Sequence, residues 1–86
     1  MTDHEQKLLR LWKEIERVDF EDNKSFAEIV DKFMFITGSS ESYLSERFGM
    51  STPSVRRWRL GQSVPHPVMR PPVYKAFQAI IESYLV

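Results

Sequence analysis

Apolar residues recur at three- and four-residue steps along most of the chain, which is the spacing of one face of an α-helix. The stripe in residues 3–19 is formed by Leu8, Leu11, Trp12, Ile15 and Val18. The stripe that follows Ser25 is wider and is formed by Phe26, Ile29, Val30, Phe33, Met34, Phe35 and Ile36. Ser25 and Glu28 have the spacing of a capping box, and Gly38 supplies a stop. We therefore predict two long helices, over residues 3–19 and 25–38, the second of them central.

Two shorter helices are predicted between residues 41 and 61. Each opens after a hydroxyl residue that can cap its first turn, and each closes on a glycine. The caps and stops are Ser39 or Ser40 with Gly49, and Ser51 or Thr52 with Gly61. Pro53 falls in a first helical turn, where its missing N–H is harmless. A turn of three to four residues joins the two helices.

The last helix is predicted over residues 71–86, after a proline-rich segment. Its apolar stripe consists of Val73, Ala76, Phe77, Ile80, Ile81, Tyr84, Leu85 and Val86. Alternation of apolar and polar residues is nowhere sustained, so we expect no strand. The predicted fold class is therefore all-α: a compact bundle of about five helices in a single domain over residues 1–86, with an extra N-terminal helix in residues 1–20.

Composition narrows the class of protein. At 86 residues the chain forms one small domain, and it has no cysteine for a disulfide or a thiolate metal site. No apolar run approaches the ~20 residues of a membrane-spanning helix, and the acidic, mixed N-terminus differs from a signal peptide. We expect a protein of the reducing cytoplasm without membrane association. No catalytic or metal-ligand pattern occurs, so we expect no enzyme activity, metal or cofactor.

Charge is unevenly distributed, although the chain has no net charge. Residues 1–40 carry nine acidic and six basic side chains, whereas residues 41–86 carry three acidic and six basic. From Arg47 to Lys75 there are six basic residues and no acidic one. A local basic surface is typical of nucleic-acid-binding domains, although a short acid-free segment also arises by chance.

Residues 41–61 have the pattern of a helix-turn-helix whose second helix is basic. Ser45 supplies a small side chain where the helices cross, Gly49 allows the positive φ of a sharp turn, and Met50 fills the corner. The residues expected to face the core are Leu44, Phe48 and Val55. The outer face, available to a major groove, is formed by Thr52, Pro53, Arg56 and Arg57.

The segment "YLSERFGMSTPSVRRWRLGQSVPHPVMRPPV" resembles the Cro and phage-repressor (XRE-type) helix-turn-helix family. The matching residues are Leu44, Ser45, Gly49, Met50, Ser51, Val55, Trp58 and Gly61, followed by Pro65, Pro67 and Arg70. The match covers residues 41–75, under half of the chain. Ser45 replaces a usual alanine, and Thr52 and Pro53 stand where the family places a long amide side chain. Contact with a thymine methyl group is expected there instead of a hydrogen bond to adenine.

The resemblance implies a transcriptional regulator, such as a repressor, that places its second helix in the major groove of a specific double-stranded DNA site. The DNA-binding residues expected from the helix face and the resemblance together are Arg47, Ser51, Thr52, Pro53, Ser54, Arg56, Arg57, Trp58, Arg59 and Arg70. Arg56 and Arg57 can each donate two hydrogen bonds to guanine, or else bind phosphate. Trp58 is expected mainly to support the core, with its N–H available to a phosphate. Arg70 either clamps a phosphate or pairs inside the domain.

Other functional classes remain open. The same helix pair can serve as a protein–protein interaction or antitoxin-like module, or it can bind structured RNA. The wide apolar stripe of the last helix predicts a homodimer, although the first helix can also cover that stripe within one chain. The acidic N-terminal helix is expected to face away from nucleic acid, and it can equally dock a protein partner.

Overall fold

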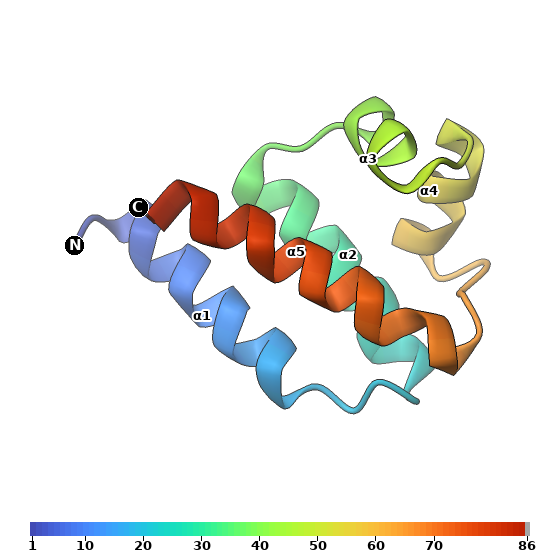
Figure 1. Cartoon of the computed structure of the whole chain (residues 1–86), viewed down its shortest axis with the longest axis horizontal. Helices are drawn as coiled ribbons and strands as arrows, with labels where there is room; N and C mark the ends of the chain where they lie inside the picture. The colour runs from blue at the N-terminus through green and yellow to red at the C-terminus, as the bar shows by residue number, and fades with distance from the viewer. Residues whose placement is uncertain (86) are drawn as a thin grey trace.

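The structure, a computed structural model that describes residues 1–85, forms five α-helices and contains no strand within that range. The helices are α1 (Asp3–Arg17), α2 (Asn23–Thr37), α3 (Glu41–Phe48), α4 (Thr52–Leu60) and α5 (Arg70–Leu85), with a short 3-10 helix, η1 (Pro67–Met69), before α5 (Figure 1). The all-α class is as the sequence predicts. Val86, the last residue of the predicted C-terminal helix, lies outside the described residues. None of the five helices has both the length and the apolar character needed to span a bilayer.

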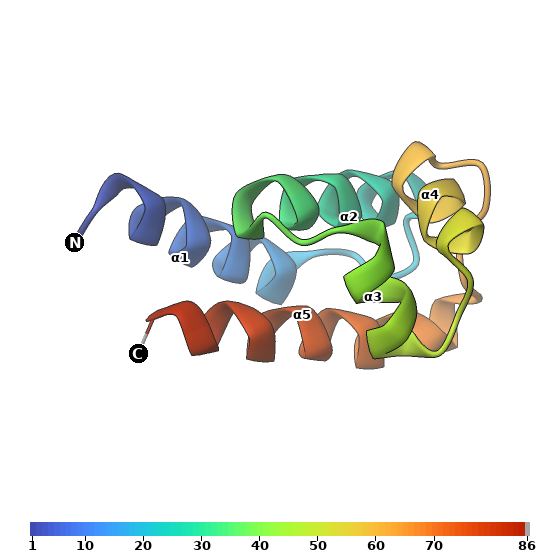
Figure 2. The ribbon, with the colours of Figure 1, turned by 90° about the horizontal axis from the view of Figure 1, so that it is seen from above.

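Helices α1, α2 and α5 form the body of the molecule, and α3 and α4 form one end of it (Figures 1 and 2). The three long helices pack against one another, and α4 packs against both α2 and α3. The start of α1 and the end of α5 lie at the opposite end of a molecule that measures 35 × 26 × 18 Å. The α3–α4 pair, residues 41–60, is therefore presented away from both chain ends.

Aromatic side chains build much of the core between these helices. Phe33 of α2 stacks on Phe77 of α5 with ring centroids 4.1 Å apart, and Phe48 of α3 meets Phe77 edge-on at 5.8 Å. The prediction that Phe35 widens the buried stripe is wrong, because its side chain is 81% exposed. Phe35 follows Phe33 by two residues, which is about 200° around a helix, so the two side chains face different directions.

Helix α2 begins earlier than the predicted capping box indicates. Its N-cap is Asp22, whose carboxylate accepts a hydrogen bond from the Ser25 N–H. The Ser25 hydroxyl also donates to this carboxylate, which lowers the pKa of Asp22. A carboxylate at a helix N-terminus satisfies free N–H groups and interacts favourably with the helix dipole. Asp22 therefore takes the capping role, and Ser25 lies in the first turn.

Most of the apolar stripe of α5 is covered within the chain, whereas Tyr84 is exposed. Helix α5 packs along α1, and its buried apolar residues are Val73, Tyr74, Phe77, Ile80 and Ile81. The Trp12 indole N–H of α1 donates to Glu82 at 3.1 Å, and Gln78 donates to Glu16 at 2.8 Å. This arrangement is the alternative in which the first helix covers the stripe within one chain. The homodimer stays a prediction, and the buried residues of that stripe do not support it; of the stripe, Tyr84 stays exposed, at 51%.

Candidate nucleic-acid interface

The turn between α3 and α4 is closed by backbone and side-chain hydrogen bonds. Gly49 ends α3 with φ 63°, a left-handed conformation that glycine adopts without steric cost. The Met50 N–H donates to the Ser45 carbonyl oxygen at 2.9 Å. Ser51 is the N-cap of α4, and its hydroxyl lies 2.8 Å from the Ser54 hydroxyl and accepts a hydrogen bond from the Ser54 N–H. Both serine hydroxyls predicted to contact DNA therefore also hold the start of α4.

Two residues anchor the inner face of α4. Val55 is fully buried, and Trp58 packs edge-on against Phe26 of α2, with ring centroids 5.2 Å apart and ring planes at 84°. Trp58 also packs against Phe48 of α3. Its side chain is half-buried, and its indole N–H is a hydrogen-bond donor. The structure thus gives Trp58 its predicted core role, and a phosphate contact through the N–H stays a prediction.

The opposite face of α4 projects from the molecule. Of the nine residues in this helix only Val55 is buried. Pro53 and Arg57 are exposed on the outer side, and Thr52 is half-buried at the start of the helix. Arg57 makes no ion pair with any residue from 1 to 85. Its guanidinium is therefore available to a ligand without first breaking an internal contact.

Arg56 lies on the same side, but Glu41 of α3 holds its guanidinium. The Arg56 Nη2 and Nε atoms donate to the two carboxylate oxygens of Glu41 at 2.8 and 3.3 Å. This is the two-bond geometry typical of arginine–carboxylate pairs, and it raises the pKa of Arg56. This edge of the guanidinium is occupied, so Arg56 can use it to contact a base only by exchanging Glu41 for that base.

Arg59 is also paired, on another side of α4. Its Nε donates to Asp31 of α2 at 2.8 Å. The partners of Arg56 and Arg59 lie 15 and 28 residues away in sequence, so no local pattern indicates these pairs. Two of the three arginines of α4 are therefore balanced by acids from earlier helices. Within the described chain, Arg57 is the arginine of α4 that keeps its charge unpaired.

The two arginines predicted to flank the helix pair have different environments. Arg47, at the end of α3, is exposed and has no ion-pair partner in the described part of the chain. Arg70 is only 1% exposed, and its guanidinium donates to the Pro65 carbonyl (2.9 Å), the Phe20 carbonyl (3.0 Å) and the Asn23 side chain. The prediction that Arg70 binds DNA phosphate is wrong, because its donors are enclosed and occupied. Arg70 instead pairs inside the domain.

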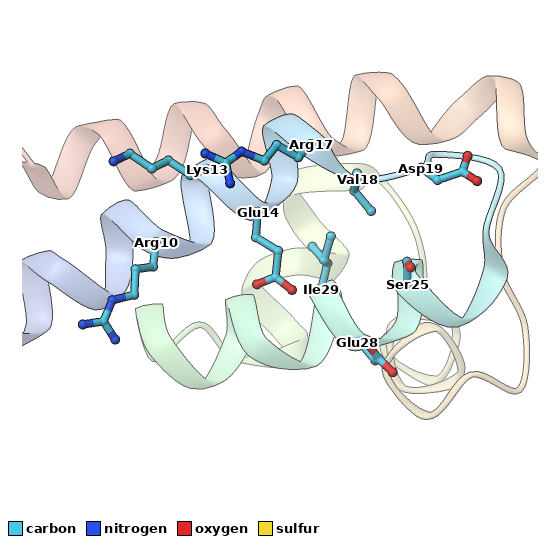
Figure 3. Close-up of a pocket in the computed structure, with 9 residues that line it drawn as sticks. All are labelled: Arg10, Lys13, Glu14, Arg17, Val18, Asp19, Ser25, Glu28 and Ile29. Carbon is cyan, nitrogen blue, oxygen red and sulfur yellow. The ribbon is translucent and has the colours of Figure 1, made fainter.

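A concave surface lies between α1 and α2, with a volume of about 540 Å³ (Figure 3). Its lining includes Arg10, Lys13 and Arg17 of α1 and Glu28 of α2. In Figure 3, Lys13 and Arg17 extend away from α2, and Glu28 extends from the far side of α2. These charges do not converge on one point. Residues 1–85 also contain no cluster of three His, Cys or acidic side chains that could hold a metal ion.

Comparison with protein-family models, with curated proteins and with solved structures gave no match to this chain. A functional proposal therefore depends on the α3–α4 pair and the side chains around it.

Proposed function

We propose that the protein binds a specific sequence of double-stranded DNA and regulates transcription, with α4 lying in the major groove. The observation that carries this proposal is the exposed, unpaired Arg57 beside Pro53 on the projecting face of α4. An arginine so placed can donate two hydrogen bonds to guanine, the commonest specific protein–DNA contact. The buried side of α4, with Val55 and Trp58, supports the helix from behind.

The outer side chains make different contacts with DNA, because their environments in the protein differ. Arg57 contacts a guanine, and Pro53 packs against a thymine methyl group. Arg56 joins the interface when a base or phosphate replaces Glu41. Arg47 binds a phosphate and fixes the position of the protein on the duplex. Because one such helix contacts few base pairs, the proposal includes a homodimer that contacts two half-sites about one helical turn, ~34 Å, apart.

Selection of bound duplexes from a random pool, at a stated salt concentration, tests this function. We expect enrichment of one motif that contains guanine. The logarithm of its affinity should fall with the logarithm of salt concentration, with a slope of about −0.9 for each phosphate contacted. A pool that stays random after repeated rounds at low salt would contradict the proposal.

A second candidate function is docking of another protein at the same end of the molecule. It is favoured by three exposed apolar side chains at the end of α4 and in the segment that follows, Leu60, Val68 and Met69. The pairing of Arg56 and Arg59 with acids also lowers the positive charge of this end. A failed DNA selection, together with a defined protein partner that Leu60→Ser releases, would favour docking over DNA binding.

A further inference from the structure

An apolar groove separates the α3–α4 pair from the first turns of α5. Within the described chain, no Cα atom of α3 or α4 lies within 8 Å of a Cα atom of α5. The edge-on contact of Phe48 with Phe77 bridges the two parts. The groove beside this contact has a volume of about 470 Å³, and its walls include Met50, Trp58, Met69, Val73 and Ala76. This volume lies within the range of ~300–1,000 Å³ that is typical of small-molecule sites.

The polar groups available in this groove are hydrogen-bond donors. Arg47 is the one charged residue among the described residues that line it, and it has no ion pair with any of residues 1–85. Trp58, another lining residue, is half-buried and carries an indole N–H donor. The segment from Arg47 to Lys75 contains no acidic residue that could neutralise the groove. A ligand that satisfies these donors must supply acceptors, and a negative charge complements Arg47.

We propose that the groove binds a small amphipathic carboxylate, an aliphatic or aromatic acid. Its apolar body lies against Met50, Trp58 and Val73, and its carboxylate pairs with Arg47. Burial of the body supplies affinity in proportion to the apolar surface removed from water. The charge supplies selectivity, because a neutral molecule leaves Arg47 unpaired and a cation is repelled. Both proposals use the guanidinium of Arg47, but the test of this site uses the protein without DNA, so its outcome does not depend on the proposed DNA-binding function.

Titration of the ¹⁵N-labelled protein with octanoate tests the site, because the chain has two tryptophans with different surroundings. Trp58 lines the groove, whereas the Trp12 indole N–H is bonded to Glu82 outside it. We expect the Trp58 indole signal to shift saturably and the Trp12 signal to stay unchanged. Decanoate should bind about tenfold more tightly than octanoate, since each added methylene contributes about three- to fourfold. 1-Octanol should bind more weakly than octanoate, and octylammonium more weakly still.

Variants distinguish the contribution of the Arg47 charge to ligand affinity from the contribution of the apolar walls. Arg47→Gln should weaken octanoate at least about tenfold while leaving 1-octanol unchanged, because only the anion uses the guanidinium. Arg10→Gln, a matched change of an exposed arginine on α1, should alter neither ligand. Ala76→Leu fills the groove with a residue that favours helix and should weaken both ligands, with the α1 amide signals confirming an intact fold.

Three results would overturn the proposal. One is a shift of the Trp12 and Trp58 signals together, or of neither. Another is equal affinity for octanoate and 1-octanol in the wild type. The third is unchanged octanoate binding by the folded Ala76→Leu variant.

Discussion

Arg70 illustrates how the surroundings of one residue decide its role. Its place in a basic, acid-free segment favours phosphate binding. In the fold its guanidinium carbon lies 5.8 Å from the centre of the Phe26 ring, and its donors reach oxygens of Phe20 and Asn23, around the start of α2, and of Pro65 in the loop before η1. No local pattern brings those two segments together. That Arg70 binds an acceptor could be predicted from its residue type, but which acceptors it binds depends on the tertiary fold.

Replacing Arg70 with lysine should destabilise the fold by at least about 2 kcal/mol, although the charge is kept. An ammonium group cannot reproduce the fixed planar donors of a guanidinium, so at least one buried carbonyl, of Pro65 or Phe20, loses its partner. Urea unfolding followed by circular dichroism measures this change. Arg47→Lys is the matched exposed control and should stay within about 0.5 kcal/mol of the wild type. An Arg70→Lys protein as stable as the wild type would contradict the buried clamp.

The hydroxyl of Tyr74 is buried without a hydrogen-bond partner in the described chain, and burial raises its pKa from 10.0 to about 12. The folded protein therefore keeps this proton at a higher pH than the unfolded chain does. The resulting stability is fully present below about pH 10 and is lost as the pH rises through about 12.

Tyr74→Phe should remove this part of the alkaline instability. At pH 7 the change should be neutral or stabilising, because it removes an unsatisfied buried hydroxyl. Urea midpoints of both proteins at pH 7 and pH 11 provide the test. A variant that loses more stability than the wild type between these two pH values would show that the hydroxyl has a favourable role.

At the scale of elements, the helix ends that depend on neighbouring residues could be predicted from the sequence. Gly38, Gly49 and Gly61 each end a helix with positive φ, a conformation that strains other residues. The sequence alone does not decide where α2 begins, because both Asp22 and Ser25 are good N-cap residues. In the structure the Ser25 N–H donates to the Asp22 carboxylate, so Asp22 is the N-cap. Ion pairs between helices could not be predicted, because they depend on which helices pack together.

Glu41 joins α3 to α4 and, under the proposed function, competes with DNA for Arg56. Glu41→Gln should raise DNA affinity up to about fivefold at low salt, because an exposed ion pair worth ~0.2–1 kcal/mol no longer has to be exchanged. Fluorescence anisotropy with the selected duplex measures the change. Asp31→Asn, which releases Arg59 on another side of α4, is the matched control and should have a smaller effect. Lower affinity of Glu41→Gln would mean instead that Glu41 holds Arg56 in its binding position.

At the scale of the whole molecule, charge along the chain differs from charge in space. The sequence predicts that basic residues gather in the second half, and the α3–α4 pair does lie away from α1 (Figures 1 and 2). Yet Asp31 of the acidic half balances Arg59 across the fold. The outer face of α4 could therefore be predicted as a candidate site. Which of its arginines is available could not, since that depends on acids from other helices.

The predicted homodimer requires an interface outside the core. Ile81 is fully buried, so an Ile81→Asp change would unfold the chain rather than separate two copies. Phe35 and Tyr84 are large, exposed at 81% and 51%, and available to a partner. Light scattering at micromolar concentration should give twice the 10.2 kDa chain mass, and Phe35→Asp or Tyr84→Asp should reduce it without lowering the melting temperature. A wild-type mass of 10.2 kDa at every concentration would exclude the dimer.

The most direct test of the central claim, that α4 contacts bases through Arg57, is the affinity of Arg57→Gln for the selected duplex and for a scrambled one. Arg10→Gln, an exposed arginine on α1, serves as the matched control. We predict that Arg57→Gln loses about 1–3 kcal/mol on the selected duplex and relaxes the preference at one guanine position, while Arg10→Gln changes neither. Binding by Arg57→Gln with wild-type affinity and wild-type sequence preference would contradict the claim.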